Sequence, residues 1–346
     1  MLPTYGEVNA RLTVPLEALD QIRELAQQKR AKYNRVLAIF FVVNVISTLV
    51  SLSYQSYYFI IGWIIFIIVW LMSVYAKRKS AEQYRTMFKR EVIAPFASKT
   101  VELCASLQDS DKHIYYCNYY PEDRMDDHWI RNCKLFDFTI DRTTGEDLLI
   151  GQLGLTEFRF SELTLVEITK STDSKGNTTT TNHTRFSGVL FVADFKKDFS
   201  GITILQSNKV VPPDSGLFKK MFGSFKQYSM VGTSRAAKIN IELESEEFNE
   251  HFNVRTSNDI EARYLLSPNL MEQILDFKKS HNEQIDISFV DSYMCIAIAS
   301  DNNYFEEPMH KEHSAGYRMK AVYDDLKFFF SLIEEFDLNT RIWSKK

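Results

Sequence analysis

The chain has 346 residues, of which 45% are apolar and 14% aromatic, enough for a sizeable core in one large domain or two ordinary ones. Its formal net charge of −4 excludes a global positive field, so no nucleic acid is expected as a partner. The four cysteines form no CxxC pair and no zinc-finger spacing, so we expect neither a disulfide framework nor a zinc site.

Residues 1–35 predict an N-terminal amphipathic helix. Leu16, Leu19, Ile22 and Leu25 recur at helical spacing, and Pro15 suits a first-turn position. The opening "MLPTYGEVNARL" lacks a basic region followed by an apolar one, so we do not expect a cleavable signal peptide.

Two apolar runs, residues 36–53 and 57–75, contain no charged residue. With its serine and tyrosine margins, each run is long enough to span a bilayer, which takes about 20 mostly apolar residues. A soluble helix normally keeps a polar face over such a length. The short gap "YQSY" then joins the runs as a transmembrane helical hairpin over residues 36–76, with membrane lipids as partners.

Cationic and tyrosine side chains mark the ends of this hairpin. Lysines and arginines precede and follow it, whereas the connecting turn has none, so the positive-inside rule predicts that both termini are cytoplasmic. Tyrosines are expected at the interfaces because their rings are amphipathic. The predicted membrane-interface residues are Tyr33, Arg35, Tyr54, Tyr57, Tyr58, Tyr75, Lys77, Arg78 and Lys79.

Asn44 is the one strongly polar residue in the middle of a run. It is typical of an interhelical hydrogen bond, helped by Ser47, Thr48 and Ser51. The alternative is part of an ion or proton path, but no ionisable residue accompanies it in the span.

Residues 77–108 predict stalk helices, with Pro95 as a kink or break. From about residue 109 we expect a cytoplasmic α+β domain that continues to residue 346. Alternating segments such as "DLLIGQLG", "TEFRFSELTLVEITK" and "RFSGVLFVADF" predict strands in a meander, hence antiparallel neighbours. Residues 171–184, "STDSKGNTTTTNHT", predict a polar loop with Gly176 and Asn177 at a hairpin tip.

The C-terminal third predicts helices around a hairpin. "SPNLMEQILDFKKS" is typical of a helix capped by Ser267, and "QIDISFVDSYMCIAIA" of a tight hairpin that turns at Asp291 and Ser292. A closing amphipathic helix carries Val322, Leu326 and Phe329 at helical intervals. The predicted fold class is therefore α+β: a two-span hairpin with a helical stalk, then an antiparallel sheet with flanking helices.

Few residues predict chemistry. Asp126, Asp127 and His128 are adjacent, but neighbouring residues diverge on a helix or strand, which favours a turn or helix start over an acid–base pair. His310 and His313 are three residues apart, yet Pro308 and Gly316 flank them and favour a solvated loop over a metal site. No catalytic motif appears, so we predict no catalytic, cofactor-binding or metal-binding residue.

Four segments together resemble a known family: residues 145–167, 184–205 and 258–298, and the closing "FDLNTRIW". In order, they are similar to the bacterial membrane-protein domain-of-unknown-function family 3137, over roughly residues 84–343. The resemblance implies a two-span hairpin before a soluble domain, the inner membrane of a bacterium, and an envelope-associated assembly. It implies no activity.

Three functions are consistent with these patterns. The first is a membrane-anchored module whose domain binds a protein or ligand as a scaffold or sensor, with a protein partner or homo-oligomer. The second is an enzyme, which requires the aspartates and histidines above to converge in one pocket. The third is a small oligomeric channel or transport component, for which only Asn44 and its hydroxyl neighbours offer polar groups.

Overall fold

The computed structural model describes residues 2–12, 16–53, 59–107, 114–194, 197–208, 237–280, 283–300, 304–305 and 315–335. It consists of two compact units. One is the helical unit, Leu12–Pro95 with Glu306–Ala321. The other is the sheet unit, formed by Met1–Arg11, Phe96–Phe305 and Val322–Lys346.

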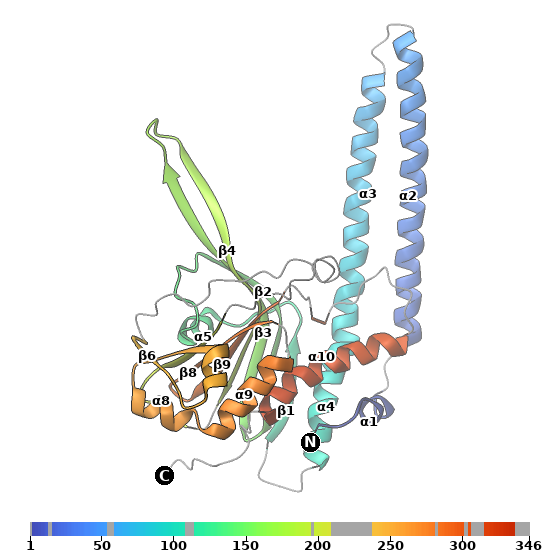
Figure 1. The fold of residues 1–346 in the computed structure, drawn as a ribbon. Coiled ribbons are helices and arrows are strands. Elements are labelled where there is room, and N and C mark those ends of the chain that lie inside the picture. The colour runs from blue at the N-terminus through green and yellow to red at the C-terminus, as the bar shows by residue number, and fades with distance from the viewer. Residues whose placement is uncertain are drawn as a thin grey trace. The chain divides into compact units, whose positions relative to one another are not determined.

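The helical unit contains α2 (Leu16–Ser53) and α3 (Phe59–Phe88), two long helices that lie side by side (Figure 1). Both are long and apolar enough to cross a membrane, and only 6% of the most apolar window of each is buried. Ile39, Leu49 and Met72, for example, are 63%, 62% and 67% exposed. A soluble core helix would bury these side chains.

Polar and small side chains join α2 to α3 in the middle of the hairpin. Trp63 Nε1 donates a hydrogen bond across the pair to Thr48 Oγ1 at 2.9 Å. Asn44 is 6% exposed, and its amide donates to the carbonyl of Phe40 on its own helix at 2.8 Å. A Cβ on Gly62 would lie 2.5 Å from Asn44 Oδ1, so the missing side chain of Gly62 allows the close approach of the helices.

The helix after α3 changes its winding near Pro95. Lys89–Ile93 form the π-helical turn η1, and α4 (Ala94–Leu107) follows with Pro95 in its first turn. Proline has no N–H for a bond to the residue four positions earlier, and a π turn is one way to accommodate the loss. The predicted irregularity at Pro95 is therefore present as a change of helix type.

In the sheet unit, nine strands of the described residues form one antiparallel sheet in the order β1-β2-β3-β4-β9-β8-β5-β7-β6. The strands are β1 (Ile114–Tyr120), β2 (Arg142–Gly154), β3 (Thr156–Thr172), β4 (Thr178–Asp194), β5 (Thr203–Ser207), β6 (Ile239–Ile241), β7 (Phe252–Thr256), β8 (Gln284–Val290) and β9 (Tyr293–Ala299). The helices are α1 (Tyr5–Ala10), α5 (Asp127–Asn132), α7 (Glu246–His251), α8 (Asp259–Leu265), α9 (Pro268–Ser280) and α10 (Ala315–Glu335), of which α10 enters this unit at Val322. The predicted α+β class with an antiparallel sheet is confirmed.

The predicted meander holds from β2 to β4 and is wrong after β4. The neighbour of β4 is β9, which belongs to the hairpin β8–β9, and β5 lies on the far side of β8. Both β8 and β9 are almost fully buried, as expected of strands at the centre of a sheet. Their position late in the chain does not predict this central place. The predicted two-residue turn at Asp291 and Ser292 is confirmed, with Asp291 at φ 55°.

Side chains on the two faces of the sheet pack against different segments. One face carries Leu163, Leu190 and Cys295, which pack with Ile130 of α5 and its neighbours. Phenylalanines on the opposite face pack on α10: the ring of Phe160 stacks on that of Phe329 at 4.1 Å, and Phe158 meets Phe330 edge to face at 5.6 Å. Because both faces of the sheet are buried, its strands carry apolar residues at consecutive positions and not only at every second one.

β3 and β4 continue past their outer neighbours as a two-stranded ribbon, residues 167–183, which extends from the sheet (Figure 1). Among the described residues, β2 pairs with β3 only as far as Val166, and β9 pairs with β4 only from Gly188 onward. The polar loop predicted over residues 171–184 is therefore mostly strand. Threonine is β-branched and favours extended backbone. The prediction of a loop gave weight to the polarity of the segment and not to this preference.

The tip of this ribbon is a short turn, as predicted. Thr172 pairs with Thr178, and the Asp173 carboxylate accepts the backbone N–H groups of Lys175 and Asn177 at 2.9 and 2.8 Å. Gly176 has φ 83°, a conformation that glycine adopts without strain. Hydrogen bonds from the backbone and side chain of Asn177 lower the pKa of Asp173.

Candidate functional site: carboxylates at a β-bulge

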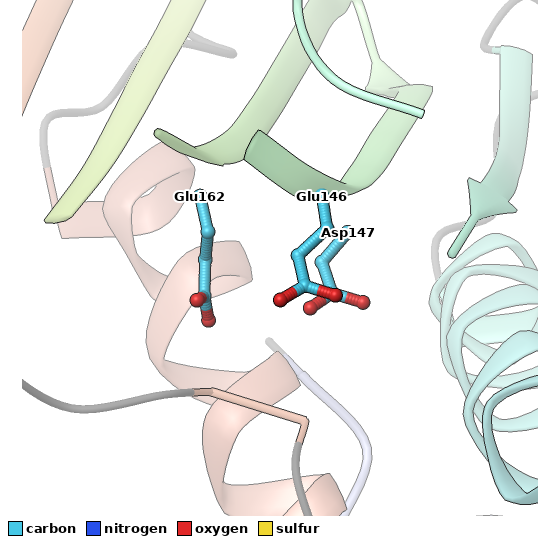
Figure 2. A group of neighbouring side chains, drawn as sticks. All are labelled: Glu146, Asp147 and Glu162. Carbon is cyan, nitrogen blue, oxygen red and sulfur yellow. The ribbon is translucent and has the colours of Figure 1, made fainter. Parts of the chain in front are cut away.

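A bulge in β2 brings two acidic side chains to one place. Glu146 pairs with Glu162 and Leu149 pairs with Phe160, so Asp147 and Leu148 oppose the single residue between those partners. Asp147 has φ 59°, and its N–H donates to the carbonyl of Pro121 at 3.3 Å. The extra residue directs the Asp147 carboxylate to the same side as that of Glu146 (Figure 2).

Three carboxylates thus form the acidic cluster Glu146, Asp147 and Glu162, with oxygens that all lie within 4.8 Å of one another (Figure 2). Asp147 is fully buried and the two glutamates are half-buried. Like charges this close repel, so the cluster is stable only with donors or cations around it.

Hydrogen bonds from other described parts of the chain help to meet this requirement. The Tyr119 hydroxyl on β1 donates to Asp147 Oδ1, and the N–H of Tyr304 donates to Glu162 Oε1 at 2.6 Å. The next N–H, that of Phe305, donates to Asp325 Oδ2 on α10 at 3.2 Å. The N–H groups of the consecutive residues Tyr304 and Phe305 therefore bind one carboxylate on β3 and one on α10.

Burial raises the pKa of Asp325 to about 6, opposed by the Phe305 hydrogen bond and increased by the charge of Asp324. Near neutral pH this group exchanges a proton more readily than an ordinary aspartate does.

The acidic cluster offers oxygen ligands of the kind that Ca²⁺ and Mg²⁺ prefer. It supplies three carboxylates, whereas Ca²⁺ takes six to eight oxygens, and protein donors already bind Asp147 and Glu162. Hydrogen bonds within the protein therefore engage Asp147 and Glu162, and they join β2 to β1 and β3 to the turn at Tyr304. The sequence alone does not predict this cluster, because Glu146, Asp147 and Glu162 lie in apolar strands at an ordinary spacing. Only the bulge in β2 brings their carboxylates together.

The acidic residues that the sequence did single out lie elsewhere. Asp126 is the N-cap residue of α5, as predicted, and Asp127 pairs with Arg124 at 2.7 Å. His128 is exposed and contacts Asn132. The enzyme hypothesis required these groups to converge with His310 and His313, which lie outside the described residues. Asp126, Asp127 and His128 themselves lie on the exposed start of one short helix.

The predicted interface residues are only partly described. Tyr33 and Tyr75 are 38% and 68% exposed, and Arg35, Arg78 and Lys79 are exposed as well. Lys77 donates from Nζ to Asn34 Oδ1 at 2.6 Å, which joins α3 to α2 at the cationic end of the hairpin. Tyr54, Tyr57 and Tyr58 lie outside the described residues.

A second buried carboxylate lies on β8. Asp286 is fully buried and accepts the N–H and hydroxyl of Ser207 at 2.8 and 3.0 Å, and the Gln284 amide at 3.2 Å. Burial raises its pKa to about 6, although these hydrogen bonds and the charge of Lys278 oppose the rise. Lys278 is itself largely buried, and burial lowers its pKa.

All four cysteines are free and buried. Burial raises the pKa of the Cys104 and Cys133 thiols to about 12, and those of Cys117 and Cys295 also rise. Buried thiols with raised pKa values are unreactive at neutral pH, so none is a nucleophile in this arrangement.

Comparison with known proteins gives one match. The model of a family described as protein of unknown function (DUF3137) matches residues 184–338. No curated protein and no solved structure matches the chain. The matched range contains the end of β4 and the helices and strands up to α10, and it is narrower than the range over which the sequence segments suggest a resemblance. The ribbon and the acidic cluster precede it. Residues 184–338 are therefore similar to the DUF3137 family, the same family that the sequence segments resemble.

Proposed function

We propose that this protein is a membrane-anchored binding module. The hairpin α2–α3 crosses the inner membrane of a bacterium with both termini in the cytoplasm. The sheet unit binds a protein partner there, as a scaffold or sensor.

The observation that carries the proposal is the outward exposure of apolar side chains along α2 and α3. Ile39, Leu49 and Met72 are each more than 60% exposed. Monomeric soluble proteins rarely expose contiguous apolar patches above a few hundred Å², because each Å² left in water forgoes about 25 cal/mol. A bilayer removes that cost along the whole hairpin.

The charges support the orientation. The seven lysines and arginines within residues 29–79 all flank the hairpin on its terminal side, and no aspartate or glutamate lies in that range. Cationic residues near spans remain in the cytoplasm. The resemblance to a bacterial membrane family agrees with this assignment.

The ribbon is the surface that we assign to the partner. Its residues 169–183 are exposed, and the outer edges of both strands carry backbone groups that no described strand pairs. A protein partner can add an extended segment to such an edge through main-chain hydrogen bonds.

Cysteine labelling tests the anchor and its orientation. Gln55→Cys lies in the gap between the runs, and Lys175→Cys lies at the exposed ribbon tip. In intact bacterial spheroplasts, an impermeant maleimide is expected to label Gln55→Cys, and to label Lys175→Cys only after lysis. Release of the protein by alkaline carbonate, or labelling of Lys175→Cys in intact spheroplasts, contradicts the proposal.

Photocrosslinking tests the partner surface. A photoreactive phenylalanine at Thr181, on the ribbon, is expected to give a discrete protein adduct in the native membrane. The matched control is Ile260 on α8, which is 84% exposed and far from the ribbon in sequence. The same adducts from both positions, or none from Thr181, exclude the ribbon as the docking surface.

A further inference from the structure

A groove lies between α2 and α3 at their cationic end. It has a volume of about 650 Å³ and an almost wholly apolar lining, with Val36 and Leu37 from α2 and Val69 and Met72 from α3. This volume falls within the roughly 300–1,000 Å³ typical of small-molecule sites. Lys32 and Tyr33 line its charged end.

Among the described residues that line the groove, Ser73 has a buried hydroxyl without a hydrogen-bond partner. Ser73 is 3% exposed. A buried hydroxyl loses its bond to water, so a site of this kind favours a ligand with an acceptor oxygen.

The charge around the groove identifies the class of ligand. Lys32 lies at its rim, Lys77 joins the helices beside it, and the flanking cations have no acidic neighbour within residues 29–79. The groove combines apolar walls, a buried hydroxyl without a partner and a cationic rim. These features match, respectively, the acyl chain, an ester oxygen and the phosphate of a phospholipid.

We propose that this groove binds one anionic phospholipid of the surrounding leaflet, with its acyl chain between α2 and α3, an ester oxygen at Ser73 and its phosphate at Lys32. The inference rests on the membrane hairpin proposed above. It differs from general lipid contact because it specifies a single site and a preference for negative headgroups.

The test uses the full chain in nanodiscs of equal parts phosphatidylglycerol and phosphatidylcholine, with native mass spectrometry of the lipid that stays bound. Wild type is expected to retain phosphatidylglycerol preferentially. Lys32→Gln should lower this preference about fivefold, because one cation near the surface is replaced. Val69→Trp fills the groove and should abolish retention, whereas Ile61→Trp, on an exposed lipid-facing position of the same helix, should not.

Equal retention of the two lipids by wild type overturns the proposal, as does an unchanged preference in Lys32→Gln. A Val69→Trp variant that retains lipid like Ile61→Trp overturns the groove as the site. Failure of the groove leaves the hairpin resistant to alkaline carbonate, whereas failure of the membrane anchor does not, so the two outcomes are distinguishable.

Discussion

Replacing Phe160 with alanine is expected to lower the free energy of unfolding of the sheet unit by about 3–5 kcal/mol. The Phe160 ring is fully buried and stacks on Phe329 at 4.1 Å and on Phe305 at 5.8 Å. Truncation removes the apolar burial and leaves a cavity between the sheet and α10. Pulse proteolysis of the full chain in urea measures the change.

The control for this experiment is Ile260→Ala, which removes an apolar side chain that is 84% exposed. It is expected to change the free energy by less than about 0.5 kcal/mol. If Phe160→Ala destabilises the sheet unit no more than Ile260→Ala, α10 does not pack on the sheet as described. Because whole domains are stable by only about 5–15 kcal/mol, Phe160→Ala is also expected to reduce the amount of folded protein.

The second large effect is a pH dependence from Asp286. Its pKa is about 6 in the folded state, raised by burial from the value of 3.8 that is usual for an aspartate. The neutral form is favoured on folding, so this contribution to stability is fully present below pH 3.8 and is lost as the pH rises through about 6. The loss amounts to about 3 kcal/mol, since one pKa unit corresponds to about 1.36 kcal/mol.

Asp286→Asn isolates this effect because asparagine does not titrate. Between pH 4 and 7.5, the difference in unfolding free energy between variant and wild type should shift in favour of the variant by up to about 3 kcal/mol. Any constant offset reflects the altered hydrogen bonds to Ser207 and Gln284. A difference that is flat with pH contradicts the raised pKa.

Ser207→Ala tests the effect of one hydrogen bond on the pKa of Asp286. The Ser207 hydroxyl donates to Asp286 at 3.0 Å and lowers the pKa of that carboxyl. Removing the hydroxyl should therefore raise the pKa of Asp286, so that stability is lost over a higher range of pH than in wild type. The backbone N–H of residue 207 remains as a donor.

Local patterns predicted much of the fold. Ser267 caps α9 with its hydroxyl at 3.4 Å from the N–H of Leu270, and the tight β8–β9 turn follows from two strongly apolar strands around Asp291 and Ser292. These features depend on residues close in sequence, so composition and spacing determine them.

Features that depend on distant pairings were missed. The insertion of β9 beside β4 depends on which apolar strand is most completely buried, and no local pattern encodes that. The acidic cluster depends on the register of β2 against β3, because a one-residue bulge at Asp147 decides which side its carboxylate faces. The ribbon was mistaken for a loop because polarity outweighed the strand preference of its threonines.

The ribbon also has a consequence for how such a protein could diverge. Past Val166, its strands pair only with each other among the described residues, so equal numbers of residues can be added or removed on both sides. Changes in steps of two per strand keep every side chain on its face and alter the reach by about 7 Å, at roughly 3.4 Å per residue. Paired insertions would thus change how far the tip extends from the sheet without altering the pairing of the strands in the sheet itself.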